Sequence, residues 1–169
     1  MRARRDREGP SGSAKDRALR LLAVRWRSRE ELRGRLHQAG FEWDEIFQAL
    51  EDLEGAGLIE DERFAKELVR DQVRRRLAGD RVIRNALREK GIAADVAESA
   101  MEDVGDEAGR AAELAARRAV RMTGLDPQAA YRRLYSVLLR RGFGHAVSST
   151  AARDALRLSE PDEGFAGGP

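Results

Sequence analysis

Arginine side chains stand in rows at helical spacing in this sequence. Arg70 and Arg74 are four residues apart, and Arg81, Arg84 and Arg88 follow at intervals of three and four. Residues at these spacings lie on one side of a helix. A guanidinium group binds phosphate or carboxylate oxygens through paired hydrogen bonds. The rows therefore predict a surface for a phosphate-bearing or acidic partner, with the candidate contact residues Arg70, Arg74, Arg75, Arg81, Arg84, Arg88, Arg132 and Arg133.

Charge is separated into blocks along the chain. Residues 42–62 hold nine acidic side chains and no basic one, and residues 92–109 hold six acidic side chains and no basic one. Residues 63–91 and 110–141 each carry a net charge of +6, so the overall net charge of +2 conceals alternating basic and acidic segments. Solubility does not require such separation. A surface rich in Arg and Glu that only faces solvent is the alternative interpretation.

Residues that could catalyse a reaction are few and poorly placed. The chain has no cysteine, and its two histidines, His37 and His145, lack the spacing of metal ligands. Ser148, Ser149 and Thr150 form no nucleophile elbow, and no glycine-containing turn carries the Lys-Ser/Thr of a phosphate loop. The acidic run lacks the alternating Asp/Asn of a calcium loop. We therefore predict that the protein is not an enzyme and holds no cofactor or metal, and that each histidine lies at a helix end on the surface.

The elements that must position the arginines follow a repeat of 51 residues. Each copy has a glycine with Leu four residues before it, an apolar residue eight before, a large apolar residue directly after and Ala nine after. The matched positions are Leu32, Leu36, Gly40, Phe41 and Ala49, then Ile83, Leu87, Gly91, Ile92 and Ala100, then Leu134, Leu138, Gly142, Phe143 and Ala151. Such a period is typical of repeat proteins, which act by presenting a surface.

Each copy predicts three helices. Ser28 and Glu31 have the spacing of a capping box at the start of the helix that ends at Gly40. Asp61 is a candidate N-cap, and Asp126 with Pro127 predicts another helix start. Aromatic residues are 5% of the chain, while the helix formers Ala, Leu, Arg and Glu abound. The expected fold is all-α, with three tandem three-helix repeats forming an elongated, curved array of right-handed helices.

The repeat sets the expected domain limits. They are a disordered basic arm at 1–14, three-helix repeats at 15–58, 59–106 and 107–157, and a flexible tail at 158–169. The last helix, with Val147, Ala151 and Ala155, is weakly apolar and is expected to pack loosely. Trp26 and Trp43 are interpreted as packing in the core or between helices, and stacking on nucleic-acid bases is the alternative.

Three segments carry a resemblance to a known family: S-R-E-E-L-R-G-R-L at 28–36, G-L-I-E-D-E-R-F-A at 57–65 and R-V-I-R-N-A-L-R-E-K-G-I at 81–92. With these segments the chain resembles the RecX family, the bacterial regulators of the RecA recombinase. Glu60-Asp61 stands where many relatives have paired Asp, and R-R-G-F at 140–143 is the clearest match in the third copy. The resemblance covers about residues 16–157. It implies three tandem three-helix repeats in a curved shape, in agreement with the repeat period.

The resemblance also implies a function. It implies a non-enzymatic regulator that binds the RecA–DNA filament and most often lowers its ATP hydrolysis and strand exchange, in homologous recombination, DNA repair and the SOS response. We expect a monomer in the cytoplasm, without a membrane segment. No apolar run approaches the roughly 18 residues of a membrane span, and the basic start lacks the apolar segment of a secretory signal.

Two other functions fit the same residues. A stand-alone nucleic-acid-binding module would use the basic helices on DNA directly, although the acidic blocks would repel phosphates. A helical scaffold for an unrelated partner would use the same surface. Affinity for naked DNA with a steep dependence on salt would favour the nucleic-acid-binding module. Strong binding only in the presence of RecA would favour the regulator.

Overall fold

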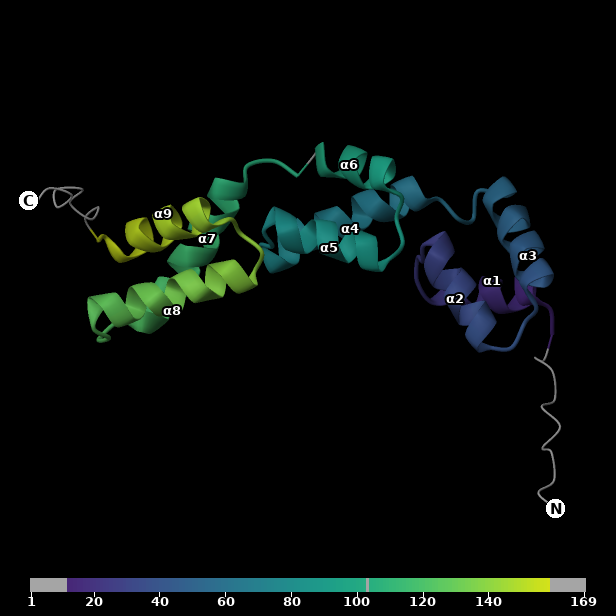
Figure 1. Ribbon diagram of the computed structural model, residues 1–169, viewed down its shortest axis with the longest axis horizontal. Coiled ribbons are helices and arrows are strands. Elements are labelled where there is room, and N and C mark those ends of the chain that lie inside the picture. The colour runs from purple at the N-terminus through teal and green to yellow at the C-terminus, as the bar shows by residue number, and fades with distance from the viewer. Residues whose placement is uncertain (1–11, 103, 159–169) are drawn as a thin grey trace, which may run out of the picture. The chain divides into compact units, whose positions relative to one another are not determined.

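The computed structural model describes residues 12–102 and 104–158. These residues form nine α-helices and one short 3-10 helix and contain no β-strand (Figure 1). The helices are α1 (Ala14–Val24), α2 (Arg29–Gln38), α3 (Trp43–Gly55), α4 (Asp61–Arg76), α5 (Asp80–Glu89), α6 (Ala94–Glu102), α7 (Glu107–Ala119), η1 (Val120–Met122), α8 (Pro127–Arg140) and α9 (His145–Leu156). The all-α prediction is confirmed.

The helices follow the repeat as three consecutive groups of three, α1–α3, α4–α6 and α7–α9. Every apolar position of the repeat is buried, and Leu36, Leu87 and Leu138 are at 0% exposure. The predicted register is therefore correct. The exact domain limits stay a prediction. The helix α1 begins at Ala14 with Ser13 as its N-cap, and most of the predicted arm and tail, residues 1–11 and 159–169, lies outside the described residues.

A glycine turn ends the second helix of each repeat. Gly40, Gly91 and Gly142 have φ values of +91°, +68° and +92°, a conformation that L side chains rarely adopt. The residue after each glycine donates its N–H to the carbonyl of the repeat leucine, at 3.2–3.3 Å. This is a Schellman helix ending, and the predicted end of the helix at Gly40 is confirmed. We call residues 39–41, 90–92 and 141–143 the first, second and third glycine turns.

Of the three predicted helix starts, Asp61 is misplaced by one residue and Ser28 lacks the predicted capping box. Ser28 Oγ accepts the Glu31 N–H at 3.1 Å as expected, but the Glu31 carboxylate turns to basic side chains instead of completing the capping box. Asp61 is the first residue of α4 rather than its N-cap, and its carboxylate accepts an N–H from α2. Asp126 caps α8 through the Ala129 N–H, with Pro127 at the first position, as predicted.

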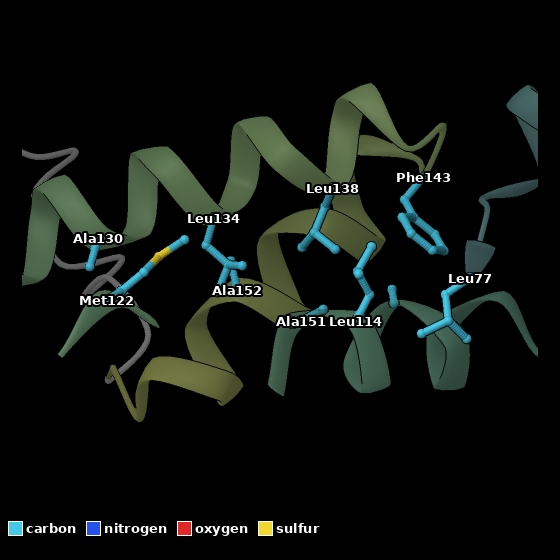
Figure 2. Close-up of a cluster of buried hydrophobic side chains, with 11 residues drawn as sticks. Leu77, Leu114, Met122, Ala130, Leu134, Leu138, Phe143, Ala151 and Ala152 are labelled. Carbon is cyan, nitrogen blue, oxygen red and sulfur yellow. The ribbon is translucent and has the colours of Figure 1, made fainter. Parts of the chain in front are cut away.

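The described residues divide into two compact units. Unit 1 runs to Leu68 and includes Leu87–Ala100, and unit 2 comprises Val69–Ala86 and the chain from Met101 onward, so the division passes through α4 and α5. The core of unit 1 joins the buried faces of α1, α2 and α3. In unit 2, Leu134 and Leu138 of α8 pack against Leu114 of α7 and the alanines of α9 (Figure 2).

The last helix packs more closely than its weak hydrophobicity predicted. Ala151 and Ala152 of α9 are at 5% and 0% exposure in the core of unit 2, and Ser148 is at 0%. Because these side chains are small, the α9 backbone can approach its neighbours α7 and α8. The expectation of loose packing was therefore wrong.

Candidate partner-binding interface

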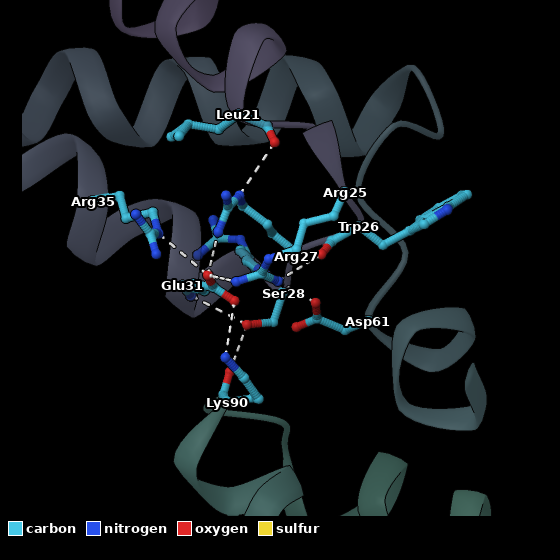
Figure 3. A network of polar contacts seen from close by, with 10 residues as sticks. Leu21, Arg25, Trp26, Arg27, Ser28, Glu31, Arg35, Asp61 and Lys90 are labelled. Atoms are coloured by element: carbon cyan, nitrogen blue, oxygen red, sulfur yellow. Dashed lines mark hydrogen bonds and ion pairs between the residues drawn. The ribbon is translucent and has the colours of Figure 1, made fainter. Parts of the chain in front are cut away.

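Successive repeats are joined where a glycine turn meets the start of the preceding repeat's second helix. In unit 1, Ser28 Oγ at the start of α2 donates to the Lys90 carbonyl of the second glycine turn at 2.5 Å (Figure 3). A Cβ added to Gly91 would collide with the side chain of Glu30. The Arg29 N–H, unpaired within its own helix because it lies in the first turn, donates to Asp61 Oδ1 at 2.9 Å. We call these contacts the first junction.

The carboxylate of Glu31 binds the basic side chains of the first junction. Glu31 Oε1 accepts hydrogen bonds from Arg25, Arg27 and Arg35, and Glu31 Oε2 pairs with Lys90 Nζ at 3.2 Å (Figure 3). Arg27 is buried at 7% exposure, and its Nε also donates to the Leu21 carbonyl at 3.2 Å. Glu31 therefore holds together α2, the segment before it and the second glycine turn.

The two carboxylates of this junction have opposite pKa shifts. Burial alone would raise the pKa of Glu31, but the hydrogen bonds from Arg25 and Lys90 lower it to about 2. Burial raises the pKa of Asp61, and the Arg29 N–H opposes that rise only in part. The difference follows from the partners, because Glu31 has cations around it whereas Asp61 also lies near the acidic Glu54 and Glu30.

The second junction, in unit 2, has the same plan with different chemistry. Gly79 takes the place of Ser28, and its backbone N–H donates to the Arg141 carbonyl of the third glycine turn at 2.8 Å. A Cβ on Gly79 would collide with the backbone of Gly142 and Phe143. The Asp80 N–H donates to Glu107 Oε1 at 3.0 Å, as the Arg29 N–H donates to Asp61.

A buried arginine holds the second junction. Arg110, at 7% exposure, donates to the carbonyls of Ala78, Val104 and Gly105 at 2.9–3.2 Å. Its Nη2 also lies 2.5 Å from Asp80 Oδ1. In the sequence Arg110 is one base in a basic run, and no local signal distinguishes it from its exposed neighbours.

All eight arginines predicted to contact a partner are exposed. Arg70, Arg74 and Arg75 lie on α4, Arg81, Arg84 and Arg88 on α5, and Arg132 and Arg133 on α8. Arg88 belongs to unit 1 and the other seven belong to unit 2. The predicted surface is therefore divided between two units.

Several of these arginines have partners within the chain. Arg81 Nη2 donates to the Leu139 carbonyl of α8 at 2.7 Å. Arg75 pairs with Asp71 one turn earlier at 3.0 Å, and Arg84 Nη1 lies 3.9 Å from Asp80. Exposed pairs of the last kind contribute little to stability, but the contact of Arg81 joins two repeats. Arg81 therefore has a structural role in addition to any contact with a partner.

An exposed aromatic group on the first repeat was not selected from the sequence. Trp43 of α3 stacks on His37 of α2 with ring centroids 4.2 Å apart, and Phe47 lies 6.0 Å beyond Trp43. Trp43 and Phe47 are each 42% exposed, and Trp26 is 45% exposed with the Arg63 guanidinium 4.4 Å above its ring. Neither tryptophan is in a core. The available signal was the Trp-x-x-x-Phe spacing, which puts both rings on one face of a helix.

The described residues offer neither a metal site nor a membrane-spanning helix. Within them, no group of three or more His, Cys, Asp or Glu side chains is arranged to hold a metal ion. No helix in that part of the chain has the length and apolar character needed to cross a membrane. His145, the second histidine, is exposed and its Nδ1 lies 2.7 Å from the Tyr135 hydroxyl.

Known proteins are similar to this chain in sequence and in fold. Residues 14–53 match the first three-helix domain of RecX and residues 61–101 match the second. The regulatory protein RecX of Corynebacterium efficiens is 39% identical over 90% of this chain and 76% of its own length. The regulatory protein RecX of Prosthecochloris aestuarii is 33% identical over 77% of this chain and 85% of its own. The crystal structure of RecX from Lactobacillus salivarius superposes with a TM-score of 0.73 at 25% identity, over 84% of this chain and 94% of that one. The chain belongs to the RecX family.

Proposed function

We propose that this protein regulates the RecA recombinase by binding the RecA–DNA filament and lowering its ATP hydrolysis and strand exchange, without catalysing a reaction itself. Its relatives are named regulatory proteins, and its repeats expose the eight candidate arginines to solvent. That exposure is the observation on which the binding role depends. The protein would act as a cytoplasmic monomer, without a cofactor, in recombination, DNA repair and the SOS response.

The arginine surface supports a partner that carries negative charge. Seven of the eight arginines lie in unit 2, and Arg74, Arg132 and Arg133 are exposed side chains on its helices α4 and α8. A basic surface mated to an acidic one accelerates association and selects the partner. In the proposed complex, acidic side chains of RecA or the DNA phosphates would supply that charge.

Co-sedimentation tests the proposal directly. The protein is centrifuged with RecA filaments assembled on single-stranded DNA, with the DNA alone and with RecA alone, and ATP hydrolysis is followed in parallel. We expect strong binding to the filament, weak binding to the DNA, and lower ATP hydrolysis. Equal binding to the DNA with and without RecA would favour the alternative, a stand-alone nucleic-acid-binding protein. In that case a log–log plot of affinity against salt would be steep.

Charge reversal locates the binding surface. The variant Arg74→Glu/Arg132→Glu/Arg133→Glu should lose filament binding because like charges would then face each other. Arg81 is left unchanged because its guanidinium bonds to the Leu139 carbonyl. The matched control is Arg17→Glu/Arg20→Glu, which reverses two exposed arginines of α1. Wild-type binding by the triple variant would show that these three arginines are not in the interface.

A further inference from the structure

The first glycine turn has the same backbone as the two turns that dock on a helix. Gly40 has a φ of +91° and the Phe41 N–H donates to the Leu36 carbonyl at 3.3 Å. In the other turns, the carbonyl before the glycine accepts a hydrogen bond from Ser28 Oγ or from the Gly79 N–H. Within residues 12–102 and 104–158, no hydrogen bond joins the Ala39 carbonyl to another repeat. The first turn therefore keeps the docking geometry without a docked helix.

Exposed aromatic side chains lie beside this turn. His37 and Trp43 stand three residues before and after Gly40, and their rings stack at 16° with centroids 4.2 Å apart. Phe47 extends the group along α3, and the Arg33 guanidinium lies 5.8 Å from the Trp43 ring. An exposed apolar group next to an unoccupied docking element indicates an interaction surface. We define the first-turn surface as residues 39–41 with His37, Trp43 and Phe47.

The other repeats do not carry this His-Trp-Phe group, although His145 contacts Tyr135 beside the third turn. The positions equivalent to His37, Trp43 and Phe47 hold Arg88, Ala94 and Glu98 in the second repeat and Leu139, His145 and Ser149 in the third. The second and third turns dock on a helix of the chain, whereas among the described residues the first has no docked helix. The large apolar side chains therefore occur at the turn that has no partner in the described chain, as expected if they contact another molecule.

A helix start in a protein fits this surface better than a nucleic acid. Both internal glycine turns meet the beginning of a helix, which supplies a hydroxyl or a backbone N–H to the free carbonyl. Glu51 lies one turn beyond Phe47 on the same face of α3, and Asp44 follows Trp43 directly, both exposed. These carboxylates would repel a phosphate backbone. Tryptophan is also enriched among the residues that dominate protein–protein binding energy.

A second copy of this chain does not supply the required helix start. The third repeat would have to present Ala130, the position equivalent to Ser28 and Gly79, but α8 begins earlier, at Pro127. The Ala130 N–H already donates to the Asp126 carbonyl at 2.8 Å. With that donor inside a helix, the contact seen at the two junctions cannot be repeated between copies.

We propose that the first-turn surface binds the N-terminal end of a helix of a RecA protomer in the filament. The proposal rests on the function proposed above and adds a second contact, on the first repeat, to the arginine surface. Its occupant is a protein, and DNA bound at this surface would be the contrary result.

Two tryptophan variants test the contact by co-sedimentation with RecA filaments. We expect Trp43→Ala/Phe47→Ala to weaken filament binding at least about tenfold with an unchanged helical circular dichroism spectrum. Trp26→Ala is the matched control because Trp26 is equally exposed but lies away from the first turn in sequence, over Arg63. It should change binding less than about twofold.

A spectroscopic measurement with a nearly native protein complements the binding assay. The chain has two tryptophans, so the variant Trp26→Phe carries Trp43 as its only indole. Labelled with 5-hydroxytryptophan, this variant can be excited separately from RecA. We expect Trp43 to lose most of its accessibility to a soluble quencher when RecA filaments are added and to keep that accessibility when DNA alone is added.

The outcomes separate this inference from the proposed function. Suppose that the wild-type protein binds filaments. If the Trp43→Ala/Phe47→Ala variant then binds equally well, or if Trp43 stays accessible to the quencher in the complex, the first-turn contact is overturned and the regulator proposal stands. Failure of the wild-type protein to bind filaments overturns both. Protection of Trp43 by naked DNA would show that a nucleic acid occupies the surface instead of a helix.

Discussion

The two junctions between repeats have one geometry and two chemical solutions. At the first, Ser28 Oγ reaches the Lys90 carbonyl and four bases surround Glu31. At the second, the Gly79 backbone reaches the Arg141 carbonyl, and one buried base, Arg110, serves three carbonyls and one carboxylate. The first junction therefore distributes its interactions over several partners, and the second concentrates them in one side chain. We expect the second to be the more sensitive to substitution.

The largest expected effect is from Arg110→Ala. The change would leave the carbonyls of Ala78, Val104 and Gly105 without this donor and Asp80 without its closest cation. Loss of one partner from a buried ionic group costs about 3–5 kcal/mol. Urea denaturation measures the free energy of unfolding.

The matched change at the first junction, Arg27→Ala, should cost less, because Glu31 keeps Arg25, Arg35 and Lys90. A larger loss from Arg27→Ala would reverse the comparison.

Acid should weaken the first junction through Glu31. Its pKa is lowered from 4.5 to about 2, so its stabilising contribution is complete above the unfolded value and disappears as pH falls through the folded value. The contribution amounts to about 3 kcal/mol lost between about pH 5 and pH 2. Asp61 acts in the opposite direction, because its pKa is raised.

Denaturation curves recorded across this pH range check the contribution. The variant Glu31→Gln should lose most of the decline in stability that the wild-type protein shows. Glu113→Gln, which removes an exposed carboxylate paired with Arg117, is the control and should retain it. An unchanged acid profile in Glu31→Gln would exclude Glu31 as the main source.

Gly79→Ala tests the close approach at the second junction. The added methyl group would meet the backbone of Gly142 and Phe143, which cannot move aside like a flexible side chain. Overpacking of this kind costs about 1–3 kcal/mol. Gly34→Ala is the control, because nothing lies within 4 Å of its new Cβ in α2; it should stabilise by about 1 kcal/mol. Equal effects in thermal unfolding would mean that Gly79 is not required by packing.

The smallest effect is expected on the outer surface of the second repeat. Arg75→Ala removes an ion pair with Asp71 in which the Arg75 side chain is 83% exposed. Such pairs are worth about 0.5 kcal/mol or less. The unfolding midpoint should be almost unchanged, whereas a loss above about 1 kcal/mol would reveal a packing role for this arginine.

The repeat could be predicted from sequence because its signals are local. Leucines at helical spacing and a glycine after the last turn determine which face is buried and where each helix ends. All the apolar repeat positions are buried, and the helix starts at Ser28 and Asp126 lie where the sequence placed them. The exposure of the candidate arginines likewise follows from their position opposite the leucine face.

The junction chemistry could not be predicted, because it depends on residues far apart in the chain. Arg110 resembles any other base in its run until its helix packs beneath the Ala78 carbonyl. The helix α4 ends at Arg76, before Leu77 with its φ of +46°, and Gly79 is needed for close packing with the third glycine turn. The aromatic group beside Gly40 depends on the fold bringing His37 onto Trp43.

The extra turn at the start of α8 matters to anyone who wishes to build longer proteins from this scaffold. The glycine turn of a three-helix block fused after α9 would need a hydrogen-bond donor at position 130. The Ala130 N–H cannot serve, because it already donates to the Asp126 carbonyl. Excising residues 126–129 and placing Ser or Gly at position 130 would recreate the start that α2 and α5 possess. A designed repeat protein based on this chain should therefore take its internal repeats from the second repeat and use the third as the C-terminal repeat.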